Sequence, residues 1–185
     1  MNLGTQLLLA LWLTTGVACA AANRPMPVQG TVQVLFSPGE APAEAIVDAI
    51  RGARKQVLVQ AYSFTDKAIA NALVEAHRRG LDVRVIADAD QARILKTSRI
   101  EDIAERGVPI WFDEEHAIAH NKVMIIDAGT AQATVLTGSY NFTQAARTRN
   151  AENLLILRGS AELTARYLDN WQQHFRHSRP ARRGR

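Results

Sequence analysis

The chain has 185 residues, a length that suits one ordinary domain and excludes two large ones. Hydrophobic residues make up 47% of it, which supports a folded core. The net charge is +4, and the five arginines of residues 176–185 leave −1 for the rest when they are removed. The basic character is therefore concentrated in an expected tail, residues 177–185, which either attracts phosphate groups of nucleic acid or anionic lipid or simply keeps the chain soluble.

The N-terminal segment has the pattern of a secretory signal. Its first twenty residues carry no charged side chain, residues 7–12 are apolar, and the small residues 18–20 resemble a cleavage site. We expect a signal peptide at residues 1–20 and a linker at 21–30, with a retained membrane anchor as the alternative. Cleavage would remove Cys19, the only cysteine, and a secreted protein without disulfides fits a bacterial periplasm.

Strand and helix signals alternate over the first half of the expected domain, residues 31–176. The expected strands are short runs rich in β-branched and other apolar residues, at 31–36, 56–62, 82–87 and 110–112. Helix starts are indicated by Pro42 in a first turn, by Asp66 as an N-cap and by a capping box from Ser98 to Glu101. This opening favours parallel strands joined by helices.

The second half of the domain contains more strands than helices. A strand at 122–127 is expected to form a hairpin with 134–136, followed by a short helix at 143–146 and a strand at 153–157. A final helix carries apolar residues at i+4 spacing, which indicates core packing: Leu163, Tyr167, Trp171 and Phe175. We predict an α/β fold with a mixed, mainly parallel β-sheet flanked by helices on both faces.

His120 and Lys122 have the clearest chemical pattern in the chain. They stand at the start of the apolar run 123–126, and side chains at i and i+2 of a strand point to the same face. An imidazole and an ammonium are therefore expected side by side. Phosphodiester chemistry needs such a pair, because the imidazole can attack phosphorus while the cation holds the phosphate oxygens. Ser139 and Asn141 would add a hydroxyl and an amide from a second strand and its turn.

The pair belongs to a longer pattern of His-x-Lys, an aspartate, Gly-Ser-x-Asn and a downstream glutamate. Its members are His120, Lys122, Asp127, Gly138, Ser139, Asn141 and Glu152. This pattern resembles the signature of the phospholipase D superfamily, and the layout resembles its small single-motif bacterial endonucleases of the plasmid-type periplasmic kind. The resemblance implies the phospholipase D/nuclease fold. The ten residues between Asp127 and Gly138 exceed the family spacing, and we expect them to form a longer hairpin turn.

The single copy of the motif predicts a homodimer. One imidazole cannot attack phosphorus and protonate the leaving oxygen in the same step, so two His120 side chains would face each other across one phosphate. One would form a phosphohistidine, and the other would act as the acid and then activate water. Lys122 and Asn141 would neutralise the phosphate oxygens. The resemblance further implies that Glu152 orients or tunes His120, that Ser139 supports the phosphate pocket, and that no metal or other cofactor takes part.

Other residues near the motif have more ordinary interpretations. The resemblance implies a mostly structural role for Asp127, which ends the strand, although it is kept among the candidate catalytic residues. Gly138 would allow a tight bend near the substrate. His116 shares the strand parity of the motif histidine, but we expect a surface or loop position. Asp88 and Asp90 are expected to be turn and cap residues rather than metal ligands.

Three functions are compatible with these residues. The leading prediction is a secreted or periplasmic, metal-independent, non-specific endonuclease that acts on DNA, and on RNA as a further substrate. The first alternative is a phospholipase D that cleaves phospholipid headgroups, but the sequence beside the motif, residues 113–115, is acidic instead of forming an apolar membrane-inserting loop. The second alternative is a catalytically silent nucleic-acid-binding module, against which the intact set of His120, Lys122 and Asn141 argues.

Overall fold

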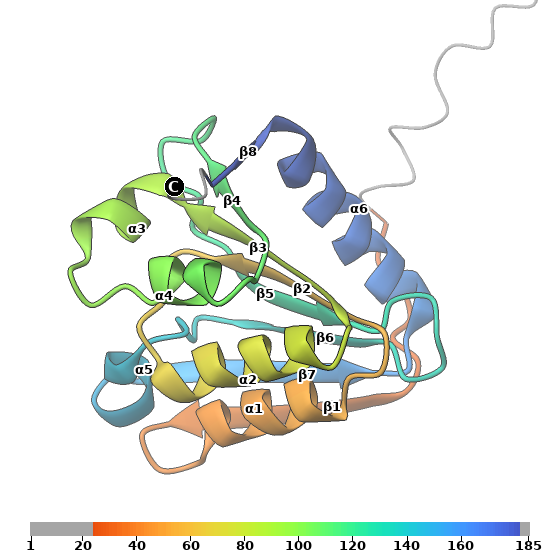
Figure 1. Cartoon of the computed structure of the whole chain (residues 1–185). Helices are drawn as coiled ribbons and strands as arrows, with labels where there is room; N and C mark the ends of the chain where they lie inside the picture. Colours follow the sequence, from red (N-terminus) through yellow and green to blue (C-terminus); the bar gives the residue numbers. More distant parts are fainter. Residues whose placement is uncertain (1–23, 182–185) are drawn as a thin grey trace, which may run out of the picture.

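The computed structural model describes residues 24–181, so the predicted signal peptide lies outside the described residues, as do residues 21–23 of the linker and 182–185 of the tail. Within that range, an eight-stranded mixed sheet has helices on both faces (Figure 1). The strand order is β1-β7-β6-β5-β2-β3-β4-β8. The predicted α/β class, with a mixed sheet between helices, is therefore confirmed.

The elements follow the chain in nearly the predicted order. The strands are β1 (Thr31–Ser37), β2 (Gln56–Ala61), β3 (Asp82–Asp88), β4 (Ile110–Asp113), β5 (Lys122–Ile126), β6 (Thr134–Gly138), β7 (Glu152–Arg158) and β8 (Arg179–Pro180). The helices are α1 (Pro42–Gly52), α2 (Lys67–Arg78), α3 (Ala89–Ile94), α4 (Ile100–Glu105), α5 (Gln144–Thr148) and α6 (Ala161–His177). Two elements were not expected, α3 and β8. Because β8 pairs with β4, the first part of the predicted basic tail belongs to the sheet.

The pairing of the strands corrects one part of the sequence prediction. Strand β2 pairs in parallel with β3, and β3 with β4, as the alternating opening predicts. Strands β5, β6 and β7, however, lie between β1 and β2, and every pair from β1 to β2 is antiparallel. The sheet is therefore mixed but not mainly parallel. Antiparallel strands need no crossover helix between them, so a short hairpin and a return strand can lie between β1 and β2.

Local signals explain where the helices begin. The Asp66 side chain accepts hydrogen bonds from the backbone N–H groups of Ala68 and Ile69, and Pro42 opens α1. Asp88 caps α3 in the same way, as expected. The predicted capping box is only partly formed, because α4 begins at Ile100, whose N–H donates to the Ser98 hydroxyl at 3.3 Å.

Two apolar layers hold the sheet between the helices. Helices α1, α2 and α4 pack on one face in the larger core. Helix α6 covers part of the other face (Figure 1). Trp171 is buried there among Leu58, Ile86 and Ile125. Its indole N–H donates to the Val59 carbonyl at 3.2 Å, so the wide ring is fixed as well as buried. No helix within residues 24–181 is both long and apolar enough to cross a membrane.

Candidate active site

The predicted site residues lie at one end of the sheet, where several strands begin or end. Lys122, the first residue of β5, pairs with Ala61, the last residue of β2. On the other side, Gly138 at the end of β6 pairs with Leu154 near the start of β7. The other site residues lie in or beside the chain segments that leave this end of the sheet: His120, Ser139, Asn141 and Glu152. The hairpin and its return strand thus bring together residues that are up to 32 positions apart.

His120 and Lys122 are brought together by Tyr62. His120 lies in the coil just before β5 rather than in the strand, and its side chain is exposed. Its ring meets the Tyr62 ring edge to face, with 4.4 Å between centroids. The Lys122 Nζ lies 5.0 Å from the centre of the same ring and donates a hydrogen bond to the His120 carbonyl at 2.8 Å. Sequence reasoning had not singled out Tyr62, because an aromatic residue at the end of a strand has no distinctive pattern.

The ammonium of Lys122 is largely removed from water. The residue is 8% exposed, and this burial lowers the pKa of Lys122, while the negative charge of Glu152 acts in the opposite direction. Within residues 24–181 the one hydrogen-bond acceptor of Lys122 is the His120 carbonyl, and a desolvated cation of this kind gains from an anionic ligand. Lys122 is therefore suited to hold a phosphate oxygen.

Glu152 is held in place by its neighbours. Its Oε2 atom accepts a hydrogen bond from the Ser139 hydroxyl at 2.7 Å, and its Oε1 atom accepts one from the Asn150 amide at 3.1 Å. The Ser139 oxygen in turn accepts the backbone N–H of Asn153 at 3.0 Å. Ser139 thus positions the carboxylate whose charge reaches Lys122. The structure shows no hydrogen bond between Glu152 and His120 in the described residues, so the orienting role of Glu152 stays a prediction.

Gly138 allows two strands to approach closely beside these residues. Its φ is +149°, and a Cβ atom at this position would lie 2.3 Å from the Asn153 carbonyl oxygen. The conformational role predicted for Gly138 agrees with this close approach. Any larger residue would push β6 away from β7 at the start of the Ser139–Glu152 contact.

Asn141 keeps unused hydrogen-bonding capacity. Its Oδ1 atom is buried and has no partner among the described residues. The neighbouring Tyr140 hydroxyl is also buried without a partner, and this burial raises the pKa of Tyr140. Buried polar groups are normally paired, and unpaired ones often mark positions that a ligand or water completes. This is consistent with the predicted role of Asn141 in binding the substrate.

Asp127 does not belong to the same group of side chains. It follows the opposite end of β5, and its carboxylate accepts hydrogen bonds from the backbone N–H groups of Arg54, Lys55 and Gln56 at 2.7–2.9 Å. It also adopts φ +51°, which turns the chain out of the strand. All three contacts are structural, and they connect the hairpin to the start of β2. A catalytic role for Asp127 stays a prediction.

Sequence reasoning missed a second group of polar residues. Asp113, His116, His174 and His177 each offer a ligand atom, and these atoms lie within 4.8 Å of one another. His116 lies in a loop as expected, but it contacts Asp113 instead of being free. Burial tends to raise the pKa of Asp113, and hydrogen bonds from the three histidines lower it well below its usual range. The spacings Asp-x-x-His and His-x-x-His could have indicated this group.

Concavity does not identify the candidate active site. A surface hollow of about 1190 Å³ lies between α4, β4 and β8. Neither His120 nor Lys122 contributes to its walls. The site is therefore recognised by the chemistry that these side chains can perform, which is imidazole attack at phosphorus beside a cation that stabilises the charge.

This chemistry and the fold define a phosphodiesterase. The chain belongs to the phospholipase D superfamily, since residues 46–177 match the family described as "Cardiolipin synthase, PLD-like domain". The predicted family and enzyme class are thereby confirmed.

Several curated relatives carry phospholipase names. The chain is 37% identical to a phospholipase D of Rickettsia bellii over 153 residues, which cover 83% of this chain and 71% of the relative. It is 36% identical to the phospholipase D of Rickettsia felis over 144 residues, or 78% and 69% of the two chains. A mitochondrial cardiolipin hydrolase of Xenopus laevis is 36% identical over 105 residues, which are 57% of this chain and about half (48%) of that protein.

Solved structures of similar size have the same fold. Nuc from Salmonella typhimurium, a phospholipase D family member, is 35% identical and superposes with a TM-score of 0.76, covering 83% of this chain and 99% of Nuc. NucT from Helicobacter pylori superposes with a TM-score of 0.70 over 82% of this chain and 99% of its own. At 24% identity, NucT supports the fold alone.

Proposed function

We propose that this phosphodiesterase is an endonuclease that hydrolyses DNA, and also RNA, without sequence preference. The observation that carries the proposal is the contact of the exposed His120 ring and the desolvated Lys122 ammonium with the same Tyr62 ring. An exposed imidazole can reach a phosphodiester in a long polymer, and the neighbouring cation neutralises the oxygens. Nuc, whose name indicates a nuclease, supports this substrate because this chain covers nearly all of it. The basic C-terminus favours a polyanion.

The proposed reaction proceeds in two steps at His120. An imidazole nitrogen attacks phosphorus while the bond from phosphorus to the leaving oxygen breaks, and a second imidazole gives its proton to that oxygen. The second imidazole then takes a proton from water, whose oxygen attacks the phosphohistidine and releases the first imidazole. Lys122 and Asn141 bind the non-bridging oxygens. Glu152, fixed by Ser139, favours the charged form of Lys122 and acts on His120 electrostatically.

The second imidazole is proposed to come from another copy of the chain. Strand β1 forms an edge of the sheet, and its outward side chains Val32, Val34 and Phe36 are 45–57% exposed. They lie opposite β7, and Phe36 pairs with Asn153 beside Glu152. We call Val32, Val34 and Phe36 the β1 stripe. A homodimer that covers the β1 stripe would remove this apolar surface from water next to the site.

Export to the periplasm completes the proposal. It rests on the signal-like sequence of residues 1–20 and on the absence of cysteine from residues 21–185. A non-specific nuclease kept outside the cytoplasm does not encounter the nucleic acids of the cell that makes it.

A phospholipase D is the second candidate, and one observation favours it. Ile118, two residues before His120, is 57% exposed, and an apolar side chain next to the site could enter a lipid surface. The curated names of the Rickettsia relatives agree with this function. The chemistry at His120 would be the same, and only the alcohol attached to phosphorus would differ.

The deciding experiment compares substrates with the same preparation of the purified chain. Plasmid DNA, single-stranded DNA, RNA and phosphatidylcholine vesicles are incubated with wild type, His120→Ala and the matched control His77→Ala, with and without EDTA, while circular dichroism confirms folding. We expect nucleic acid cleavage by wild type and His77→Ala alone, in both buffers. Headgroup release without nucleic acid cleavage would replace the nuclease by a phospholipase D. If His120→Ala kept full activity, the assigned nucleophile would be wrong, and inactivity of folded wild type on every substrate would favour the silent binding module.

A further inference from the structure

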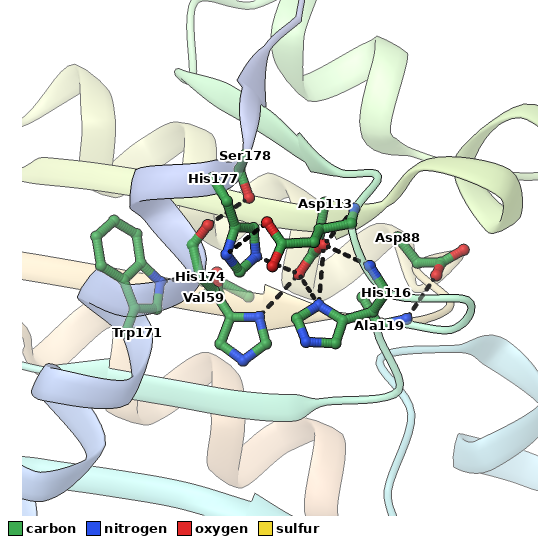
Figure 2. A network of polar contacts seen from close by, with 10 residues as sticks. Val59, Asp88, Asp113, His116, Ala119, Trp171, His174, His177 and Ser178 are labelled. Atoms are coloured by element: carbon green, nitrogen blue, oxygen red, sulfur yellow. Dashed lines mark hydrogen bonds and ion pairs between the residues drawn. The ribbon is translucent and has the colours of Figure 1, made fainter.

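A second cluster of chemically active side chains lies where the end of α6 meets the loop after β4. Asp113 is the last residue of β4, His116 lies in the loop, and His174 and His177 occupy the last turn of α6. Figure 2 shows the three imidazoles directed at the Asp113 carboxylate from these two elements. We call these four residues the Asp-His cluster. It contains three of the five histidines of the chain, none of which is His120.

The contacts in the Asp-His cluster converge on one point. Asp113 Oδ2 lies 2.8 Å from His174 Nδ1, 3.1 Å from His177 Nε2 and 3.1 Å from His116 Nδ1. Each of the four residues offers one ligand atom, and every pair of these four atoms is at most 4.8 Å apart. Four ligand atoms around one centre are the number that a tetrahedral ion uses.

Burial and charge make a cation the best complement to this arrangement. The Asp113 side chain is fully buried, and the side chains of His174 and His177 are 13% and 22% exposed. The three rings lie close together, with 4.9–5.2 Å between centroids, and each presents a nitrogen to the same carboxylate. Imidazole nitrogens and a carboxylate oxygen that face one centre are ligands that a cation can join.

We propose that Asp113, His116, His174 and His177 bind a divalent transition metal ion, with zinc as the best match. Three imidazole nitrogens and one carboxylate oxygen form a ligand set typical of zinc, whereas magnesium and calcium prefer sites made of oxygen alone. Zinc holds such ligands at about 2.0–2.2 Å, so small rotations of the side chains would close the site around the ion. The Glu115 carboxylate, 3.6 Å from His177 Nδ1, is placed to orient that ring from behind.

The ion would have a structural role. Four protein ligands fill a tetrahedral site and leave no open position for a substrate. The site would join the C-terminal turn of α6 to the loop that leads to His120. The same loop is held at its other end, where the Ala119 N–H donates to Asp88 Oδ2 at 2.8 Å (Figure 2). The metal and Asp88 together would fix the segment that carries His120 without taking part in the reaction.

Metal analysis and thermal unfolding of the purified full-length chain test this proposal. We expect one zinc per chain by elemental analysis after dialysis against metal-free buffer. Zinc at about 100 times its dissociation constant should raise the melting temperature of chelator-treated protein by roughly 5–10 °C, and magnesium at the same concentration should not. Cobalt in place of zinc should give the visible absorption of a tetrahedral site.

Variants distinguish a metal site from a hydrogen-bonded cluster. His177→Ala should lose the zinc-dependent shift and the cobalt spectrum, and the matched control His77→Ala, on α2, should keep both. His116→Ala is the second test variant, because its side chain is 46% exposed and the protein should fold without it. A wild-type protein without bound zinc, or a zinc-dependent shift that survives in both cluster variants, would overturn the proposal.

Discussion

The Lys122 Nζ atom donates a hydrogen bond to the main-chain carbonyl of His120 at 2.8 Å. The cation of the motif is thus held against the backbone of the residue assigned as the nucleophile. The contact fixes the spacing of the two groups before any substrate binds. It also leaves the remaining ammonium hydrogens for a ligand, since an ammonium has three donors. This preorganisation is what electrostatic catalysis requires.

Replacement of Lys122 by Gln should therefore reduce catalysis more than binding. We expect kcat for a simple phosphodiester, bis(4-nitrophenyl) phosphate, to fall by about 10²–10³, because charge on the transferred phosphoryl group would no longer be neutralised. Steady-state kinetics of Lys122→Gln and of the surface control Lys67→Gln measure the effect. Equal activity of Lys122→Gln and Lys67→Gln would remove Lys122 from the mechanism.

The pH dependence of the reaction should report the environment of Lys122. Burial lowers the pKa of Lys122 from the ordinary value of 10.5, so the ammonium should lose its proton, and the enzyme its activity, at a lower pH than an exposed lysine would allow. The negative charge of Glu152 opposes this shift. Glu152→Gln should therefore move the alkaline limb of the kcat/KM profile to still lower pH.

The same shift has a consequence for stability. Since the folded state binds the Lys122 proton less tightly than the unfolded state, the free energy of unfolding should rise with pH between the lowered pKa and 10.5. If Glu152→Gln had the same pH profile of kcat/KM as wild type, the electrostatic coupling between Glu152 and Lys122 would be contradicted. Glu162→Gln, which neutralises a charge in the first turn of α6, is the control and should leave the kcat/KM profile unchanged.

Asp127→Asn should separate structure from chemistry. The carboxylate binds three backbone N–H groups with its two oxygens, and an amide offers only one acceptor oxygen. We expect a loss of about 2–3 kcal/mol in the free energy of unfolding, measured by urea denaturation. The kcat of the folded fraction should stay close to that of wild type. A large fall in kcat at full foldedness would return Asp127 to the catalytic group.

The sequence predicted the elements that carry the candidate site because its residues follow local rules. The spacing of His120 and Lys122, the hairpin after Asp127 and the glycine at 138 each depend on a few neighbouring positions. Even there, His120 was expected at the start of the strand and lies in the coil before it. The prediction that side chains at i and i+2 share a face still placed His120 beside Lys122, because residues 120 and 121 lead directly into β5.

Long-range pairing was beyond such rules. Nothing near β1 shows that its partner is β7, which begins 121 residues after it, and so the alternating opening predicts only parallel strands joined by helices. The Asp-His cluster was missed for the same reason, since Asp113 and His174 are 61 residues apart and meet only because α6 packs across β4. Sequence periodicity identifies elements, whereas contacts between elements depend on the order in which the sheet is assembled.

Gly138→Ala should disturb the site more than an ordinary glycine replacement. The added Cβ would approach the Asn153 carbonyl oxygen to 2.3 Å, and backbone of a neighbouring strand cannot move aside cheaply. We expect a loss of more than about 2 kcal/mol in stability together with reduced kcat, because Ser139 directly follows β6. Gly129→Ala is the control: its φ is +76° but no atom lies within 4 Å, so only a backbone cost of about 1 kcal/mol is expected. Similar losses in the two variants would show that close packing at Gly138 does not matter.

The proposed dimer can be separated from the fold by charging the β1 stripe. Val34→Lys should leave the chain folded, because this side chain is already 45% exposed, but it should place a cation in the apolar contact. We expect light scattering to give the mass of a monomer and phosphodiesterase activity to fall by at least about tenfold, since one imidazole would lack its partner. Ile94→Lys is the matched control, because Ile94 is 70% exposed on α3, away from β1, and should remain an active dimer. A Val34→Lys monomer with full activity would show that one His120 is sufficient, and an active Val34→Lys dimer would place the contact on another surface.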